Sequence, residues 1–263
     1  MLAVQCCVEP VTWEVVFPIL LAVGLAAGII SAFMGIGGGL IMVPVLHYGL
    51  DLAWGEATAA SLLAITIQVP LGIWHHHKRR AVDWRRAALL VIGGAAGVAV
   101  GMWSMSAIPV TIFKVLFAGI LALAAYRLWQ PSRVVGSVRW QGNFVPLTLG
   151  VVAGVLSRWL GIGGGLITTP ALVLSGVAVH AAIGTSLVAV WTNAALATAF
   201  FAWGPGVFFA GLALGLGGLA GAPIGARLVH SLSPRRVSAV LAWGLIVVAI
   251  AMAFDALRGA QAA

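Results

Sequence analysis

Two glycine-rich stretches hold the residues of this chain that are best suited to binding chemistry. GIGGGLIMVPVL at 35–46 and GIGGGLITTPAL at 161–172 each place four glycines within five positions, and a proline follows five residues later. Glycine and proline are the poorest helix formers, so each stretch is expected to break a helix, with Pro44 and Pro170 as helix-breaking residues. A glycine turn that leads into a helix N-terminus presents free backbone N–H groups and the positive end of the helix dipole, which together suit an anion.

Uncharged polar side chains follow each stretch at matched positions. Ser61 and Gln68 are seven residues apart and share a helix face, and the second half repeats this spacing. Such groups suit an oxyanion that must be held and then released, although hydrogen bonding between helices explains them equally well. The predicted substrate-binding residues are Gly35, Gly37, Gly38, Gly39, Ser61, Gln68, Gly161, Gly163, Gly164, Gly165, Thr185, Ser186 and Asn193.

The second of these half-sites is the more polar and has a charge beside it. Thr168 and Thr169 stand where the first half has Met42 and Val43. Arg158 interrupts an apolar run just before the second glycine stretch. An arginine inside a membrane is a candidate charge partner for an anion, and the alternative is that its side chain extends to the outer interface.

Three consecutive histidines, His75, His76 and His77, end the segment that carries Ser61 and Gln68. Consecutive residues do not share a helix face, and no acidic or cysteine residue accompanies them, so a basic loop is favoured over a metal centre. His75 alone continues the face of Ser61 and Gln68, which makes it a candidate for a proton-linked gate. No metal site and no cofactor are predicted.

The composition excludes most soluble functions. The 263 residues are 62% hydrophobic and only 8% charged, with a mean hydropathy of +1.11, whereas soluble domains carry about 25% charged residues. The net charge of +8 does not indicate nucleic acid, because the basic residues lie between apolar runs. The few acids lie almost entirely in loops, so no catalytic residues and no enzyme are predicted. Adjacent Cys6 and Cys7 are the only cysteines and build no disulfide framework.

The chain repeats itself with an offset of about 125 residues, as secondary transporters often do. The first glycine stretch then falls on the second, Pro44 on Pro170, and Ser61 on Ser186. The sequence predicts an N-terminal repeat at 10–129, a polar cytoplasmic linker at 130–142, and a C-terminal repeat at 143–256. Apolar segments are expected near 14–33, 39–50, 57–74, 87–104, 110–129, 144–160, 165–176, 181–203, 207–227 and 235–256.

The loop charges predict that the two repeats are inserted upside down relative to each other. Most Lys and Arg residues lie in 75–86, in the linker and in 227–236, and these loops are expected to face the cytoplasm. The basic loop 75–86 corresponds to the uncharged 202–208, and the uncharged 104–110 corresponds to a basic segment of the second half. Each repeat must then cross the membrane an odd number of times, with both termini outside.

The segments after the glycine breaks are too short to span a bilayer. About 12 residues give roughly 18 Å of helix, against a hydrocarbon core of about 30 Å. Each is therefore expected to form a re-entrant hairpin with the preceding segment, although two full crossings give the other loops the same sides. Irregular backbone at membrane depth requires protein or a polar cavity around it, so the two turns are expected to meet near the midplane.

These features together resemble the sulfite exporter TauE/SafE family of membrane permeases. The doubled GIGGGL motif carries the resemblance, together with the following ATAASL at 57–62 and AIGTSL at 182–187. The resemblance implies an inner-membrane transporter for sulfite, sulfoacetate or related small anions, and it points to the same glycines, prolines and polar residues. The first half departs from the family's GTS, because it has Ala59 and Ala60 before Ser61.

The sequence therefore predicts an all-α, polytopic inner-membrane protein that exports a small oxyanion, such as sulfite or an organosulfonate, by alternating access. Two alternatives stay open: a non-transporting membrane assembly partner, and a permease for a non-sulfur organic anion. The expected partners are the small anion and the lipid bilayer, with no nucleic acid. A homo-oligomer is left open.

Overall fold

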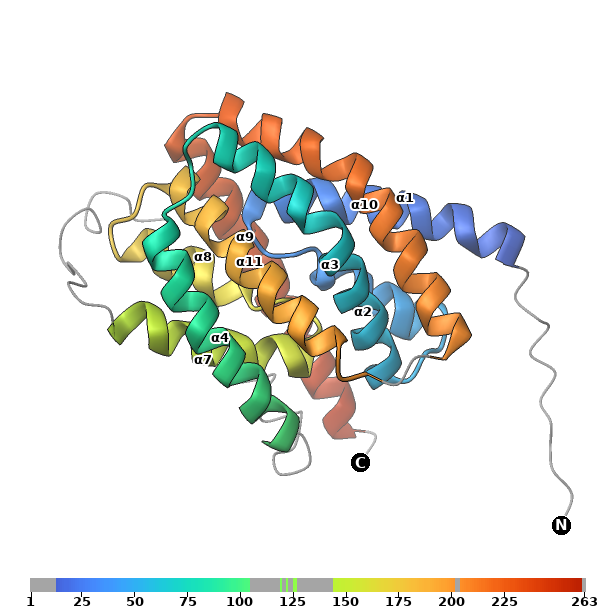
Figure 1. Ribbon diagram of the computed structural model, residues 1–263. Coiled ribbons are helices and arrows are strands. Elements are labelled where there is room, and N and C mark those ends of the chain that lie inside the picture. The colour runs from blue at the N-terminus through green and yellow to red at the C-terminus, as the bar shows by residue number, and fades with distance from the viewer. Residues whose placement is uncertain are drawn as a thin grey trace, which may run out of the picture.

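The regular structure is entirely α-helical in the described residues, which are 13–104, 144–201 and 204–261 together with residues 119, 122, 125 and 126 of the computed structural model (Figure 1). This confirms the all-α prediction. The helices are α1 (Trp13–Met34), α2 (Gly39–Gly49), α3 (Trp54–Lys78), α4 (Trp84–Ser104), α7 (Phe144–Leu160), α8 (Gly165–Leu174), α9 (Val179–Thr198), α10 (Pro205–Ser231) and α11 (Pro234–Gln261).

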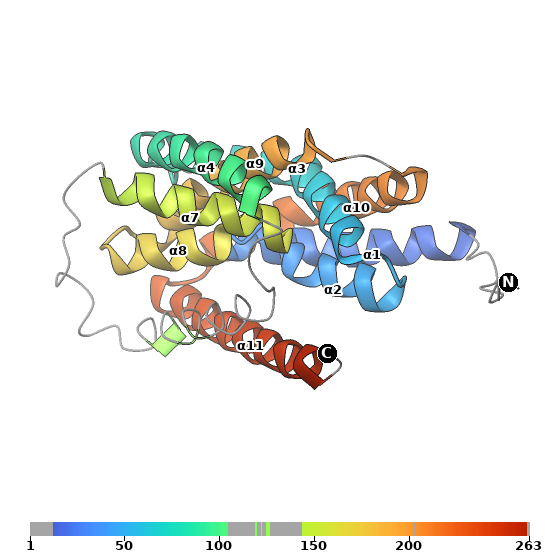
Figure 2. The ribbon, with the colours of Figure 1, turned by 90° about the horizontal axis from the view of Figure 1, so that it is seen from below.

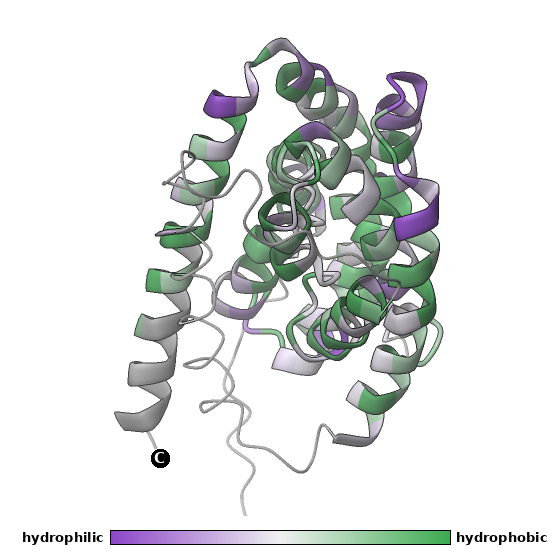
Figure 3. Ribbon diagram, turned by 90° about the vertical axis from the view of Figure 1, so that its left-hand side faces the viewer, coloured by the Kyte–Doolittle hydropathy of each residue, from purple (hydrophilic) through white to green (hydrophobic). Residues whose placement is uncertain are grey.

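Five helices, α1, α3, α4, α9 and α10, are long and apolar enough to cross a membrane within the part of the chain that the structure describes. Hydrophobic residues cover most of their length, and hydrophilic residues gather mainly near the helix ends (Figure 3). Large apolar side chains also face outward, with Trp103 87% exposed and Phe144 73% exposed. A lipid environment accommodates such a surface, so the chain is a multi-pass membrane protein. The segment expected at 110–129 and the linker at 130–142 lie almost entirely outside the described residues.

The helices break at the glycines and not at the prolines. Pro44 lies inside α2 and Pro170 lies inside α8, so the prediction that these prolines break helices is wrong. Each proline is the sixth residue of a short helix, where its missing N–H removes one backbone hydrogen bond and the remaining bonds keep the helix intact. In the membrane, neighbouring helices accommodate such a local defect.

The two halves of the chain interlock through long helix pairs. α1 packs along α10, α4 packs along α7, and α3 lies against both α9 and α10 (Figures 1 and 2). Glycines line the first two contacts: a Cβ added at Gly221 would overlap the carbonyl oxygen of Leu25 in α1, and one at Gly97 would overlap that of Val151 in α7. Small residues let these backbones touch, as is common between membrane helices. Each half therefore contributes one helix to each pair, while α11 lies along the edge of the bundle (Figure 2).

Candidate functional site

Each glycine stretch forms a turn that only glycine adopts without strain. Gly35, Gly37 and Gly38 have φ of +74°, +98° and +82°, and the turn separates α1 from α2. The second turn repeats this between α7 and α8, where Gly161, Gly163 and Gly164 have φ of +69°, +77° and +83°. These values lie in the left-handed region, which a Cβ disfavours. The predicted helix breaks are thus confirmed at the glycines.

The two turns lie directly against each other. A Cβ added at Gly39 would overlap the carbonyl oxygen of Gly161, and a Cβ added at Gly165 would overlap the carbonyl oxygen of Gly35. Val190 in α9 lies against both turns, because its side chain would contact a Cβ at Gly37 and one at Gly163. Segments about 125 residues apart in the sequence therefore form one central crossing.

Serines on α3 and α9 hold this crossing together. Ser61 Oγ donates to the carbonyl oxygen of Gly161 at 2.8 Å, and Ser186 Oγ donates to that of Gly35 at 3.1 Å. Both serines are fully buried. Each serine belongs to the half opposite the turn that it binds, so the hydroxyls join the two halves.

The two amide side chains, Gln68 and Asn193, occupy matched positions but face different helices. Gln68 Nε2 donates to the carbonyl oxygen of Gly37 at 3.2 Å, and because a carbonyl oxygen only accepts, this bond fixes the orientation of the amide. Gln68 Oε1 then faces Gly218 in α10, and the amide of Asn193 faces Gly94 in α4. Both side chains are fully buried.

Three of these amide atoms lack a hydrogen-bond partner in the described part of the chain: Gln68 Oε1, Asn193 Oδ1 and Asn193 Nδ2. A buried polar group without a partner destabilises the fold, usually by about 1–3 kcal/mol. Such groups are rare in folded proteins, and a bound ligand or water molecule is one way to satisfy them. Asn193 is therefore, within the described part of the chain, the predicted binding residue whose side chain has the most unused hydrogen-bonding capacity.

The N-termini of the two half-helices provide further donors. Gly38 precedes α2 and Gly164 precedes α8, and no side chain caps either terminus in the described residues. The first N–H groups of an α-helix have no partner inside the helix. The N-termini of α2 and α8 both lie next to the crossing of the glycine turns. Uncapped backbone donors and the positive ends of two helix dipoles are therefore close to this crossing.

The second half adds hydroxyl groups at this crossing. Thr169 Oγ1 donates to the carbonyl oxygen of Gly35 at 3.1 Å, and Thr168 Oγ1 lies 2.5 Å from Ser186 Oγ. The carbonyl of Gly35 therefore receives two hydroxyl groups. The greater polarity predicted for the second half thus appears as additional hydrogen bonds on the turn of the first half.

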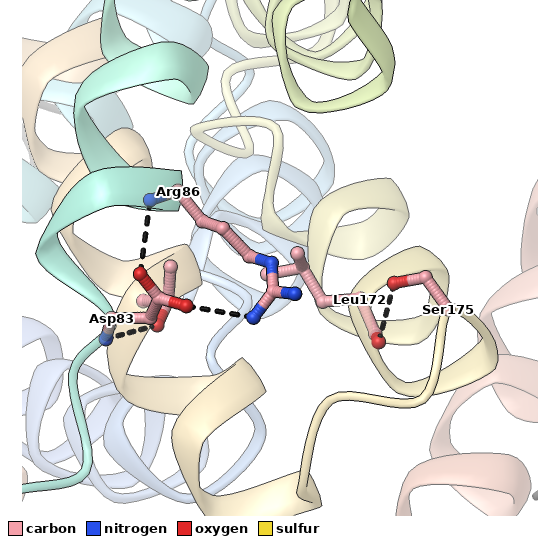
Figure 4. Close-up of polar contacts among 5 residues, drawn as sticks. Asp83, Arg86, Leu172 and Ser175 are labelled. Atoms are coloured by element: carbon pink, nitrogen blue, oxygen red, sulfur yellow. Dashed lines mark hydrogen bonds and ion pairs between the residues drawn. The ribbon is translucent and has the colours of Figure 1, made fainter. Parts of the chain in front are cut away.

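Thr185 lies in a different place from the other predicted residues. Its Oγ1 accepts a hydrogen bond from the backbone N–H of Asp83 at 2.9 Å, in the loop between α3 and α4. Asp83 in turn forms an ion pair with Arg86 at 2.7 Å (Figure 4). The hydroxyl of Thr185 therefore fastens the start of α4 to α9.

Arg158 ends α7 and stacks on an aromatic ring. Its guanidinium carbon lies 4.0 Å from the centroid of the Phe201 ring, which follows α9. Its Nε and Nη1 atoms are buried without a hydrogen-bond partner in the described residues. A cation over an aromatic face is stabilised by the ring quadrupole, so this contact holds the charge at one end of the bundle.

Sequence reasoning missed one polar cluster, which contains His76, His180 and His230. His76 Nδ1 lies 3.1 Å from His230 Nε2, and the rings of His180 and His230 stack with centroids 5.3 Å apart. His75, the residue singled out by its helix face, instead has its Nδ1 against the Leu71 carbonyl of its own helix. The packing of α3, α9 and α10 brings these three histidines together, and no local sequence pattern predicts that they form a cluster.

Comparisons with known proteins agree with this architecture. A model of the sulfite exporter TauE/SafE family matches residues 20–252. A "Probable membrane transporter protein" of Methanocaldococcus jannaschii is 27% identical over 177 residues, which cover 65% of this chain and 66%, just under two thirds, of that protein. Another of that description from Xylella fastidiosa is 24% identical over 88% of this chain and 90% of its own length. One from Bacillus subtilis is 27% identical, over 86% of this chain and 78% of its own. No solved structure matches the chain.

Proposed function

We propose that this chain exports a small oxyanion such as sulfite or an organosulfonate. The chain belongs to the sulfite exporter TauE/SafE family and is a membrane transporter, and this membership supports the proposal. The anion binds where the two glycine turns cross. Transport is secondary, driven by a gradient and not by a nucleotide.

One observation carries this proposal: two uncapped helix N-termini adjoin the same glycine crossing. Asn193, a fully buried amide without a hydrogen-bond partner in the described residues, lies three residues along α9 from Val190, whose side chain lies against both glycine turns. Backbone N–H groups at a helix N-terminus favour negative charge. The Asn193 amide adds a donor that is neutral, so the anion is held without a permanent countercharge. Such a site binds an oxyanion firmly enough to select it and weakly enough to release it.

Access to this site requires a movement of the helices. Ser61, Gln68, Ser186 and Asn193 are all 0% exposed. The glycine-lined contacts between α1 and α10 and between α4 and α7 each join the two halves, so sliding or rocking along them opens the crossing toward one side at a time. This is the alternating access that inverted repeats support in other transporters.

The orientation follows from the basic segments. The loop after His76 and the segment around His230 meet through the hydrogen bond between these two residues, so both basic segments lie at one end of the bundle. We assign this end to the cytoplasm and both termini to the outside, with the protein in the inner membrane.

The test is uptake of labelled sulfite into proteoliposomes that contain the purified protein, with sulfate, sulfoacetate and acetate as competitors. Saturable uptake that sulfoacetate inhibits supports the proposal. Inhibition by acetate alone points to a non-sulfur organic anion. Absence of saturable uptake of any of these anions by folded protein overturns the proposal and favours a non-transporting assembly partner.

Asn193→Leu tests the site itself. Removing a buried amide that has no partner should leave the Tm unchanged or raise it, whereas loss of an anion ligand should reduce uptake at least about tenfold, which corresponds to roughly 1.4 kcal/mol of binding free energy. The matched control is Thr192→Val on the same helix, because the Thr192 hydroxyl bonds the Val188 carbonyl of its own helix. Equal uptake by both variants contradicts the assignment of Asn193.

A further inference from the structure

A cluster of three histidines lies at one end of the bundle and is not part of the proposed anion site. His76 comes from α3, His180 from α9 and His230 from α10. His76 is fully buried, and the other two are partly exposed. The cluster therefore runs from the protein surface to a buried imidazole.

Backbone carbonyls fix which nitrogen carries the proton in two of these rings. His76 Nε2 lies 3.0 Å from the carbonyl oxygen of Ala32, and His180 Nε2 lies 3.0 Å from that of Val229. Because a carbonyl oxygen only accepts, both Nε2 atoms carry hydrogen. In neutral His76 the Nδ1 atom must then accept the hydrogen bond that His230 Nε2 donates.

This geometry lets the pair of His76 and His230 hold one proton without breaking its hydrogen bond. A proton that arrives at His230 Nδ1 is balanced by transfer of the Nε2 proton to His76 Nδ1, and the bond between the rings simply reverses direction. A second proton would place N–H against N–H and break the bond. Among the described residues, the other charged or titratable groups close enough to act on this pair are His180, His75 and Arg79.

The buried end of the pair contacts the helix turn that leads into the first glycine turn. Ala32, which His76 binds, lies in the last turn of α1, and the N–H of Gly35 bonds the neighbouring Ser31 carbonyl at 2.8 Å. A Cβ added at Gly184 would lie 3.0 Å from the Cβ of His76, next to Thr185 and Ser186 in α9. A charge on the pair of His76 and His230 therefore acts both on the end of α1, which leads into the first glycine turn, and on the part of α9 that carries Ser186.

A metal ion does not explain the cluster. No set of three His, Cys, Asp or Glu side chains is disposed to hold a metal within the part of the chain that the structure describes. The Nε2 atoms of His76 and His180 already donate to carbonyl groups, which removes them as ligands.

We propose that His76 and His230 together form the binding site for one proton whose movement is coupled to that of the oxyanion. This inference rests on the proposed function and names its energy source. When α10 slides along α1, His230 moves either toward His76 or away from it. Uptake and release of the proton therefore accompany the opening of the glycine crossing.

The test compares His76→Gln and His230→Gln with the wild type in proteoliposomes, with the membrane potential clamped at zero. Glutamine keeps N–H donors for the Ala32 carbonyl but takes up no proton. His77→Gln is the control, because His77 is exposed and its imidazole lies against the Trp84 ring, away from the His76 and His230 pair. Sulfite itself binds protons near neutral pH, so all variants are compared on the same gradients.

With one proton per anion, a gradient of one pH unit supports about tenfold more accumulation of sulfite. Wild type and His77→Gln should show this additional accumulation, whereas His76→Gln and His230→Gln should take up sulfite down its own gradient and lose the response to pH. A full response to pH in the two glutamine variants overturns the inference and leaves the transporter proposal intact. Loss of downhill uptake in folded His76→Gln also overturns it, since His76 would then belong to the anion path. Failure of the wild type to take up sulfite is instead a failure of the proposed function.

Discussion

The two glycine turns have the same backbone but different side-chain support. Gly35 in the first turn receives hydrogen bonds from both Ser186 and Thr169, whereas Gly161 in the second turn receives one from Ser61. The additional hydroxyl comes from the second half and serves the first turn. Because the turns cross, the polarity of one half therefore stabilises the backbone of the other, and a half-site cannot be understood from its own half alone.

The largest effect should come from adding a methyl group to either turn. Gly38 and Gly164 have φ of +82° and +83°, and a Cβ at each would press on the carbonyl oxygen of Ala27 or Ala153, respectively. Strain of about 1–2 kcal/mol and overpacking of about 1–3 kcal/mol should together lower the stability of Gly38→Ala and Gly164→Ala by about 2–5 kcal/mol. Thermal unfolding in detergent measures this loss. Gly176→Ala is the control, because φ is +88° but no atom of the described residues lies within 4 Å of the added Cβ.

Equal losses of stability in Gly38→Ala and Gly164→Ala, both well above the loss in Gly176→Ala, support the equivalence of the two turn backbones. A loss in one turn that matches only the control would break that equivalence.

A smaller effect should separate the two serines. Ser61→Ala removes the only side chain among the described residues that donates to the Gly161 carbonyl, and an unsatisfied buried carbonyl costs about 1–3 kcal/mol. Ser186→Ala leaves Thr169 on the Gly35 carbonyl, so the loss should be only about 0.5–1 kcal/mol. The Tm of the two variants, measured side by side, gives the order. A lower Tm for Ser186→Ala than for Ser61→Ala contradicts the role assigned to Thr169.

The smallest effect should follow from giving the first half the hydroxyl that it lacks. Val43 occupies the position that matches Thr169, and its side chain lies 3.0 Å from the Cβ that would be added at Gly161. Val43→Thr alone should change stability by less than about 1 kcal/mol, because the new hydroxyl can donate to the Gly161 carbonyl. The informative measurement is the Tm of Val43→Thr combined with Ser61→Ala, which should recover most of the loss caused by Ser61→Ala. No recovery would show that the two half-sites differ in backbone position as well as in side chains.

Local residue properties account for the parts of the fold that the sequence predicted. Apart from the segment at 110–129, which lies almost entirely outside the described residues, the apolar segments form helices within a few residues of the expected bounds, since hydrophobicity and length specify a membrane helix. The breaks lie at the predicted glycines because a positive φ is accessible to glycine without strain. The prolines misled the prediction, since Pro44 and Pro170 lie where a helix tolerates the missing hydrogen bond.

The candidate site was less accessible to prediction. Ser61, Gln68 and Ser186 do gather at the crossing, and their repeated spacing was the signal that identified them. Asn193, which the same spacing identified, faces Gly94 in α4. Thr185 has no polar counterpart in the first half, where Ala60 stands at the matching position. It bonds the loop before α4, since a side chain one position along a helix points about 100° away from that of Ser186.

The sequence by itself determined a helical membrane protein of two similar halves, each interrupted by a glycine turn, because composition, periodicity and the conformational freedom of glycine act within a short stretch of chain. Only the tertiary structure decided that the turns touch, that each serine serves the opposite half, and that His76 rather than His75 meets His230. The physical reason is that these partners lie on helices far apart in the sequence, and their contacts depend on how those helices rotate and cross.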